Sequence, residues 1–234
     1  MTGRDMLEGR GGRQAGTWAI VPLRGLETAK TRLGPALDAE ERLALVIAMA
    51  SRTLTATRDA EAIAGTVLVT ADAAAADLAR SFGARTLVQR LPGLNAALRE
   101  ARAEAVRSGA TATIIIPIDL PAIDAAGLDA LLAKIAAARS GAGAVVGLVP
   151  DRHGRGTNVL YTAPPDAIDP AFGDGSLAAH RTAALEAGAQ LVEIGGPLVL
   201  DVDTGDDLLA AETAASAARH ADAATARAGH IDAS

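Results

Sequence analysis

The sequence predicts a single α/β domain with a mostly parallel central sheet, helices on both faces and a small antiparallel insertion. The chain has 234 residues, half of them apolar, which suffices for one elaborated domain with a buried core. Short aliphatic runs alternate with longer segments of helical periodicity, as expected when helices connect parallel strands. The alternation stops after Pro150, where a Gly/Arg-rich loop leads into a β-rich segment without an intervening helix.

The two ends of the chain carry weaker signals than the part between them. Residues 1–16 contain five glycines and lack apolar periodicity, so we expect an N-terminal tail there. The domain is expected to span residues 17–210. Residues 211–234 are Ala-rich with scattered polar residues, which predicts the end of a helix and a flexible tail.

Each aliphatic run is predicted to be a strand that leads into a helix. The run at residues 17–23 precedes a helix from Asp38, where Asp38 and Glu41 form a capping-box pattern and apolar residues follow at helical spacing. The other strands expected before Pro150 are residues 65–70, 84–89, 111–119 and 143–150, and helices begin near Ala73, Leu94 and Asp124.

The part of the chain after Pro150 is expected to begin with an antiparallel insertion or edge strand. The remaining predicted elements are a helix over residues 176–187, strands over 190–194 and 197–203, and a final helix from Asp206.

The composition excludes several classes of protein. Two Phe, one Tyr, one Trp and a net charge of −6 leave no stacking platform or basic surface for nucleic acid. The lack of Cys removes disulfides and thiolate chemistry, so a bound metal is expected to have oxygen ligands. No apolar run reaches the roughly 18 to 20 residues of a membrane span. We therefore expect no membrane partner and a cytoplasmic location.

Carboxylates follow two of the predicted strands. Asp119 lies between Ile118 and Leu120 in the run TIIIPIDLP. Asp201 and Asp203 lie two residues apart in LDVDT, so they can share a face. Ligands of open α/β sheets bind beyond the carboxyl ends of the strands. Three carboxylates there suit a hard divalent cation, and we expect Mg²⁺. The alternative is that Asp203 caps the helix near Asp206 and Asp119 caps a turn.

A basic loop follows the first predicted strand. It contains Arg24, Lys30 and Arg32 and could cradle a triphosphate. The loop matches neither GxGxxG nor GxxxxGK[ST], which argues against dehydrogenases and P-loop ATPases. The alternative is a solvated basic loop without a ligand.

The segment DRHGRGTN forms a second cationic group. Arg152, His153 and Arg155 are expected to close over an anionic substrate, while Thr157 and Asn158 supply hydroxyl and amide donors. We interpret His153 as a phosphate or structural contact, since no partner carboxylate or nucleophile adjoins it. The alternative is an exposed tight turn.

Two predicted helix starts complete the candidate residues. Gly173 and Ser176 lie in FGDGS, where donors at a helix N-terminus could bind an anion, although Ser176 as a plain N-cap explains the pattern too. His180 lies one turn further, and the sequence leaves its place in core or surface open. Asn95 begins the helix after GL and could contact a base edge or simply start the helix.

Taken in order, the motifs resemble those of the guanylyltransferases that make the precursor of the deazaflavin redox coenzyme, acting on phosphoenolpyruvate or 2-phospho-L-lactate. The likeness covers about Trp18 to Leu208, and Arg24 stands where Lys is equally expected. The resemblance implies a Rossmann-like, GT-A-like nucleotidyltransferase fold, similar to that of molybdenum-cofactor guanylyltransferases. The motifs that carry it are VPLRGLETAKTRL, GLNAAL, IPIDLP, DRHGRGTN, FGDGS and LDVDT.

This resemblance implies transfer of GMP from GTP to the phosphate of a small three-carbon acid, with release of pyrophosphate and with Mg²⁺ as cofactor. The candidate acids are phosphoenolpyruvate, 2-phospho-L-lactate and 3-phospho-D-glycerate, and the Arg-rich, bacterial-looking sequence favours the first. The downstream deazaflavin transferase is an implied partner that draws off the product. A homodimer is compatible with the sequence, which leaves the oligomeric state open.

The resemblance also implies a role for each candidate residue. Asp119, Asp201 and Asp203 hold the metal, Thr157, Gly173 and Ser176 hold the acid, Lys30 and Arg32 steady the GTP phosphates, Asn95 lies near the nucleoside, and Arg24, Arg152, His153 and Arg155 contact substrate. Lys30, Arg32 and Asp119 are the expected catalytic residues.

Two other functions remain open at this point. One is a nucleotidyltransferase with another acceptor, such as a sugar phosphate or molybdopterin. The other is a non-catalytic module that binds a nucleotide. Three aspartates weigh against the module, because a pure binder has little use for a multi-carboxylate metal site.

Overall fold

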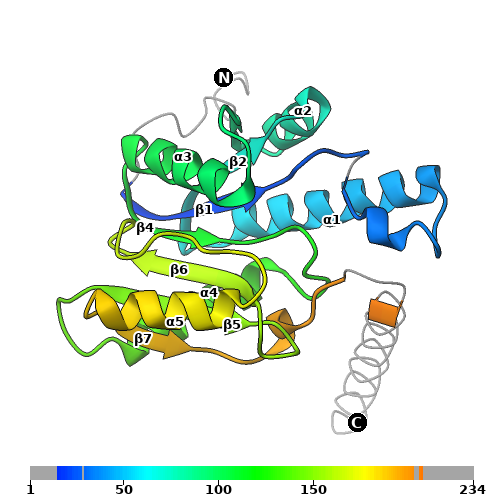
Figure 1. Ribbon diagram of the computed structural model, residues 1–234. Coiled ribbons are helices and arrows are strands. Elements are labelled where there is room, and N and C mark those ends of the chain that lie inside the picture. The colour runs from blue at the N-terminus through cyan, green and yellow to red at the C-terminus, as the bar shows by residue number, and fades with distance from the viewer. Residues whose placement is uncertain (1–14, 28, 203–205, 208–234) are drawn as a thin grey trace, which may run out of the picture.

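The computed structural model describes residues 15–27, 29–202 and 206–207 of the chain (Figure 1). None of its described helices is long and apolar enough to cross a membrane. The predicted C-terminal tail lies outside the described residues. The elements are, in chain order, β1 (Gly16–Pro22), the 3-10 helix η1 (Thr31–Leu33), α1 (Ala39–Asp59), β2 (Ile63–Thr70), α2 (Ala73–Ser81), β3 (Arg85–Val88), α3 (Leu94–Arg107), β4 (Ala110–Ile115), α4 (Ala125–Ala138), β5 (Val145–Pro150), β6 (Thr157–Ala163), α5 (Ser176–Glu186), β7 (Gln190–Glu193) and the 3-10 helix η2 (Pro197–Val199).

The strands form one seven-stranded sheet in the order β3, β2, β1, β4, β6, β5, β7. Neighbours pair in parallel except around β6, which runs antiparallel to both β4 and β5. The predicted α/β class is therefore confirmed, and β6 is the predicted antiparallel insertion. It is an interior strand rather than an edge strand, since Leu160 pairs with Ile115 of β4 on one side and with Leu148 of β5 on the other.

Helices cover both faces of the sheet, as the aliphatic strands predict (Figure 1). Along β1, Ala19 and Val21 pack into the clusters that contain α1, α2 and α4, whereas Trp18 and Ile20 pack against α3 and α5. Successive side chains of a strand point to opposite faces, so a strand buried on both sides must be apolar throughout. The carboxyl ends of all strands except β6 meet at one edge of the sheet.

The chain beyond β7 differs from its prediction. The expected strand over residues 197–203 is wrong for its described part, which forms η2 and an extended segment. Gly196, at a φ of 132°, and Pro197 turn the chain away from the sheet after Glu193. The aliphatic run packs into the core at Leu198, which is 8% exposed, instead of pairing with a neighbouring strand.

The capping box predicted for α1 is confirmed. One carboxylate oxygen of Asp38 accepts hydrogen bonds from the N–H groups of Glu40 and Glu41, both at 2.9 Å. The Glu41 side chain returns a bond by accepting the Asp38 N–H at 2.9 Å. These bonds satisfy donors that the first turn of a helix leaves without an intrahelical partner.

We predict that Asp38→Ala lowers the free energy of unfolding by about 1 kcal/mol, because the capping oxygen is lost. Asp38→Ser keeps a capping oxygen and should stay close to wild type. Urea unfolding followed by circular dichroism measures both. Equal midpoints for the Ala variant and wild type would contradict the assigned role of this cap.

Candidate active site

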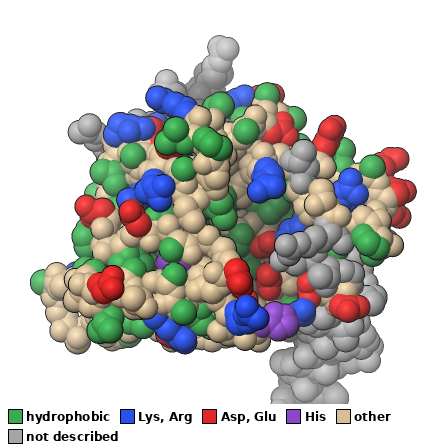
Figure 2. Space-filling model, in the orientation of Figure 1, with side chains coloured by type: hydrophobic (Ala, Val, Ile, Leu, Met, Phe, Trp, Pro, Cys, Tyr) green, Lys and Arg blue, Asp and Glu red, His purple; other side chains and the backbone are tan. Residues whose placement is uncertain are grey.

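Two adjoining pockets open at the carboxyl edge of the sheet, beside β1 and β4. These two strands are neighbours in the sheet, although β2 and β3 lie between them in the sequence. Ligands of open α/β folds bind at such a switch point. The large pocket measures about 540 Å³ and the small pocket about 150 Å³. Figure 2 shows a hollow on this side, with charged side chains around it. The large pocket is lined by the loop after β1 (Arg24, Ala29, Lys30) and the segment before α3 (Gln89, Pro92, Gly93), the small pocket by Thr157, Asn158, Phe172 and Asp201, and both by Pro22, Leu94, Pro117 and Asp119.

An ion pair lies at the junction of the two pockets. The Lys30 ammonium donates to Asp119 Oδ2 at 2.5 Å, and the two side chains are only 9% and 18% exposed. Lys30 has a φ of 55°, and it is the only non-glycine residue with positive φ in the described chain. Left-handed backbone costs about 1 to 3 kcal/mol in such residues and persists only where surrounding contacts hold it. The pair thus fixes a cation and a carboxylate at the point where both pockets meet.

The other oxygen of Asp119 is available to a ligand. Asp119 Oδ1 is buried and has no hydrogen-bond partner within the described residues. A buried carboxylate oxygen left in this way is costly unless something binds it. Asp201 lines the same small pocket, while Asp203 lies outside the described residues. Of the three predicted carboxylates, the described residues include Asp119 and Asp201. The described residues alone contain no cluster of three metal-ligating side chains.

Asp201 reaches this pocket because the segment after η2 crosses the sheet edge. The Asn158 side chain donates to the Leu198 carbonyl at 3.0 Å, and the Val202 N–H donates to the Asp119 carbonyl at 3.0 Å. These contacts attach the segment to the start of β6 and to the loop after β4. Asn158 therefore helps to place Asp201. Its side-chain amide, which the sequence predicts as a donor to substrate, donates here to the Leu198 carbonyl.

The basic loop is held by Asp72, a residue that the sequence did not single out. Asp72 caps α2 by accepting the Ala74 N–H at 2.8 Å, and its other oxygen accepts the Leu26 N–H at 2.8 Å. The bond from Leu26 is the main reason that the pKa of Asp72 lies below its usual value. Arg24 is exposed and lines the large pocket. Arg32 lies in η1, and its side chain is outside the described part.

The loop between β5 and β6 is closed by Asp151. The two oxygens of its carboxylate accept the N–H groups of Arg155 at 2.9 Å and Gly156 at 2.8 Å. A Cβ atom on Gly156 would lie 2.6 Å from Asp151 Oδ2, so the bond requires glycine at this position. The predicted cationic hairpin is thus a structured turn. Asp151 directly after an aliphatic strand is the signal that could have revealed it.

The three cationic side chains of this loop have different surroundings. Arg152 pairs with the buried carboxylate of Asp207 and donates to His153 Nε2 at 3.0 Å. Arg155 contacts Asp174 at 3.1 Å, but both side chains are largely exposed, so this pair is easily exchanged for a ligand. His153 is exposed. Their predicted substrate contacts stay predictions.

The three predicted acid-binding residues lie together beside the small pocket. The Thr157 N–H donates to Ser176 Oγ at 2.9 Å, and the Ser176 N–H donates to the Gly173 carbonyl at 3.2 Å. Gly173 has a φ of 138° and Gly175 a φ of 69°, which favour glycine at both positions. Gly175 is the N-cap of α5, so the alternative of Ser176 as the N-cap is wrong.

Asn95 fastens the loop before α5 to α3. Its Nδ2 donates to the Phe172 carbonyl at 2.9 Å, and its Oδ1 accepts the Phe172 N–H at 2.8 Å. This amide faces the Phe172 wall of the small pocket, and Asn95 is not among the residues that line the large pocket. Its predicted place near the nucleoside stays a prediction.

His180 is fully buried behind the small pocket. Its Nδ1 lies 2.9 Å from Thr157 Oγ1, and its Nε2 accepts the Ala171 N–H at 2.9 Å. The Phe172 ring packs edge-on against the imidazole, with centroids 5.1 Å apart. Burial lowers the pKa of His180 to about 4, so the ring is neutral near pH 7. Sequence alone left the place of His180 undecided.

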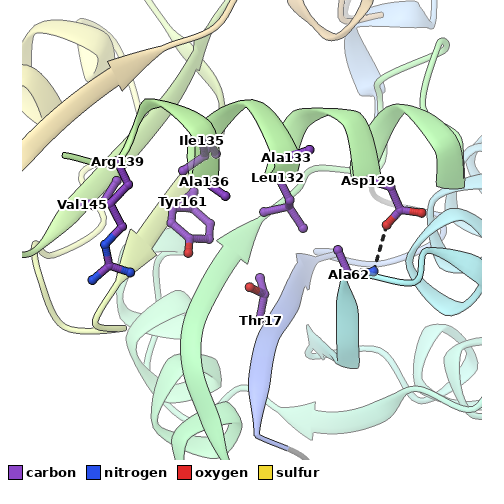
Figure 3. A pocket seen from close by; sticks show the side chains of 10 residues that line it. All are labelled: Thr17, Ala62, Asp129, Leu132, Ala133, Ile135, Ala136, Arg139, Val145 and Tyr161. Atoms are coloured by element: carbon purple, nitrogen blue, oxygen red, sulfur yellow. Dashed lines mark hydrogen bonds between the residues drawn. The ribbon is translucent and has the colours of Figure 1, made fainter. Parts of the chain in front are cut away.

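Another pocket, of about 380 Å³, lies at the opposite edge of the sheet, under α4 (Figure 3). Its polar side chains already have partners within the protein. Asp129 accepts the N–H groups of Glu61 and Ala62, and Arg139 donates to the carbonyls of Gly141 and Gly143. Burial raises the pKa of Tyr161 in its wall. Among the charged candidate residues, Arg24, Lys30, Asp119 and Asp201 line the large or the small pocket instead.

The fold is shared by solved nucleotidyltransferase structures. A putative nucleotide-diphospho-sugar transferase from Desulfovibrio desulfuricans matches with a TM-score of 0.60 at 16% identity, covering 82% of this chain and 84% of that one. A nucleotidyl transferase from Methanothermobacter thermautotroptrophicus matches with a TM-score of 0.56 at 18% identity, covering 83% and 94%. The chain therefore has the fold of the nucleotidyltransferases.

Sequence comparison narrows this class. Residues 17–214 match the family model described as "Guanylyl transferase CofC like". A protein of Sphaerobacter thermophilus named phosphoenolpyruvate guanylyltransferase is 42% identical over 193 residues, which are 82% of this chain and 90% of that protein. One of the same name from Conexibacter woesei is 40% identical and covers 82% and 85%. The chain belongs to the CofC-like guanylyl transferase family, as its motifs predict, and is an enzyme of the nucleotidyltransferase class.

His180 should make stability depend on pH. The folded pKa of about 4 lies below the usual value of 6.5, so the unfolded chain binds a proton that the folded chain does not. The stability contribution is complete above pH 6.5 and declines as the pH falls toward 4, by roughly 3 kcal/mol in total. Urea unfolding at several pH values should show a shallower decline for His180→Phe than for wild type. Parallel declines would contradict this assignment.

Proposed function

We propose that the protein transfers GMP from GTP to the phosphate of phosphoenolpyruvate and releases pyrophosphate, as a step in deazaflavin coenzyme biosynthesis. The observation that carries this proposal is the position of Asp119, which borders both pockets and pairs with Lys30. Relatives about 40% identical over most of the chain bear the name phosphoenolpyruvate guanylyltransferase.

The two pockets suit two substrates of different size. The large pocket has the volume of an ordinary nucleotide site and carries Arg24 and Lys30 on one wall, where the triphosphate would lie. The small pocket suits a three-carbon phospho-acid, and Thr157 lies in its wall. With both ligands bound, their phosphates would meet beside Asp119. This is the arrangement that a transfer between two phosphates requires.

In the proposed reaction an oxygen of the acceptor phosphate attacks the α-phosphorus of GTP. A new bond forms between that oxygen and phosphorus, the bond to the β-phosphate oxygen breaks, and pyrophosphate leaves with the electron pair. A phosphate monoester has its second pKa near 6, so it is already largely ionised at pH 7. The protein therefore needs no strong base, and its task is to hold two polyanions in line and neutralise them.

The residues at the junction fit Mg²⁺. Asp119 offers a buried oxygen without a partner among the described residues, Asp201 lies in the same pocket, and Asp203 follows two residues later. Carboxylate oxygens are the ligands that Mg²⁺ prefers. When bound, the ion would neutralise charge that builds up on the phosphates. Lys30 would hold Asp119 in place from the other side and present its positive charge to the triphosphate.

The direct test measures pyrophosphate release from GTP and Mg²⁺ with phosphoenolpyruvate, 2-phospho-L-lactate and 3-phospho-D-glycerate in parallel. The downstream deazaflavin transferase and its acceptor are added to trap the product. We expect turnover with phosphoenolpyruvate. Turnover with another of the three acids would change the acceptor and keep the reaction. If none of the three acids supports pyrophosphate release, in folded protein that binds GTP, the proposal is contradicted.

We predict that Asp119→Asn lowers the rate about a hundredfold or more without unfolding the protein, because the metal and Lys30 lose their shared carboxylate. The matched control is Asp77→Asn, whose exposed carboxylate pairs with Arg80 on α2, away from both pockets. Binding of Mn²⁺, followed by electron paramagnetic resonance, gives a readout that does not depend on turnover. Wild-type Mn²⁺ affinity in Asp119→Asn would remove the metal assignment.

A further inference from the structure

We infer that His180 is a positioning residue, which turns the hydroxyl proton of Thr157 toward the small pocket and so toward the anionic acceptor. The inference rests on the proposed function for the identity of that acceptor. The His180 ring lines neither pocket, so in this role it acts on the acceptor through Thr157. It assigns a chemical role to a buried histidine that the proposed reaction does not otherwise use.

The hydrogen-bond partners of His180 determine which nitrogen carries the proton. The Ala171 N–H points at Nε2 over 2.9 Å, so Nε2 must be the acceptor and cannot carry a proton. A neutral imidazole then has its proton on Nδ1, which donates to Thr157 Oγ1 over 2.9 Å. In a doubly protonated ring, the Nε2–H donor would face the Ala171 N–H donor. The low pKa of His180 agrees with a neutral ring.

This tautomer decides what the Thr157 hydroxyl can do. Since Thr157 Oγ1 accepts the hydrogen bond from His180 Nδ1–H, its own O–H must be directed elsewhere. The Thr157 backbone N–H already donates to Ser176 Oγ at 2.9 Å. Thr157 is 7% exposed and lines the small pocket. Its hydroxyl therefore enters the pocket as a donor, which favours an anionic oxygen there over a group that donates.

The same ring also contacts the segment that carries Phe172, another lining residue of the small pocket. Nε2 binds the backbone at Ala171, and the imidazole packs edge-on against Phe172. The competing explanation is therefore that His180 only anchors this segment and does not orient the Thr157 hydroxyl. The two roles use different nitrogens, so variants that keep one nitrogen position at a time can separate them.

Two amide variants make this separation. The amide of His180→Asn reaches the position of Nδ1 and can donate to Thr157, whereas that of His180→Gln reaches the position of Nε2 and can accept the Ala171 N–H. His180→Phe keeps the ring and removes both nitrogens. We expect the KM for the phospho-acid to rise about tenfold in the Phe and Gln variants and to stay within about twofold of wild type in the Asn variant. The KM for GTP should change little in all three.

The expected coupling to Thr157 provides a second kinetic test. In a Thr157→Val background, His180→Phe should add no further rise in the KM for the acid, since the hydroxyl that it orients is gone. The matched control is Thr113→Val, which removes another buried hydroxyl, bonded to Thr162 at 2.9 Å within the sheet. It should lower stability and leave the KM for the acid unchanged.

The closing experiment reads the tautomer directly in the full-length chain. Long-range proton–nitrogen correlation spectra near pH 7, with His180→Phe to assign the signals, should show a neutral ring protonated at Nδ1. A ring protonated at Nε2 overturns the inference whatever the kinetics, as does a Gln variant that matches wild type while the Asn variant fails. Absence of turnover in wild type counts against the proposed function instead, and the tautomer still tests the role of His180.

Discussion

The ion pair between Lys30 and Asp119 is the contact on which the arrangement of the site depends. It joins the loop after β1 to the loop after β4, two segments 89 residues apart in the sequence and adjacent in the sheet. The pair closes the switch point, where a strained lysine and a buried carboxylate face each other. One carboxylate oxygen is held by the ammonium, and the other has no hydrogen-bond partner in the part of the chain that the structure describes. Both pockets border this pair.

The single antiparallel strand explains how the second half of the site is built. Because β6 runs against its neighbours, its first residues lie at the carboxyl ends of β4 and β5. Thr157 and Asn158 therefore begin β6 inside the small pocket instead of at the far edge of the sheet. Asn158 binds the segment that leads to Asp201 through the Leu198 carbonyl. Thr157 forms hydrogen bonds with Ser176 and His180 of α5. A parallel strand at this position would offer neither contact.

Residue patterns were sufficient for the elements whose reasons are local. Alternating aliphatic runs and the capping box of Asp38 and Glu41 predict the strands and α1 because these signals depend on near neighbours. The run after Gly196 has the aliphatic pattern of a strand, but its burial comes from packing into the core and not from strand pairing. Asp72 and Asp151 were missed because each binds backbone donors of a loop. The burial of His180 could not be predicted, because its contact with Thr157 joins residues 23 apart in the sequence and no local pattern indicates it.

The most direct measurement of this account is a crystal structure with phosphoenolpyruvate, Mg²⁺ and a GTP analogue that carries a methylene group between the α- and β-phosphates. The account predicts the nucleotide in the large pocket, the acid beside Thr157 in the small pocket, and the two reacting phosphates next to Asp119. A nucleotide that occupies the pocket under α4, or an acid phosphate remote from Asp119, would contradict it.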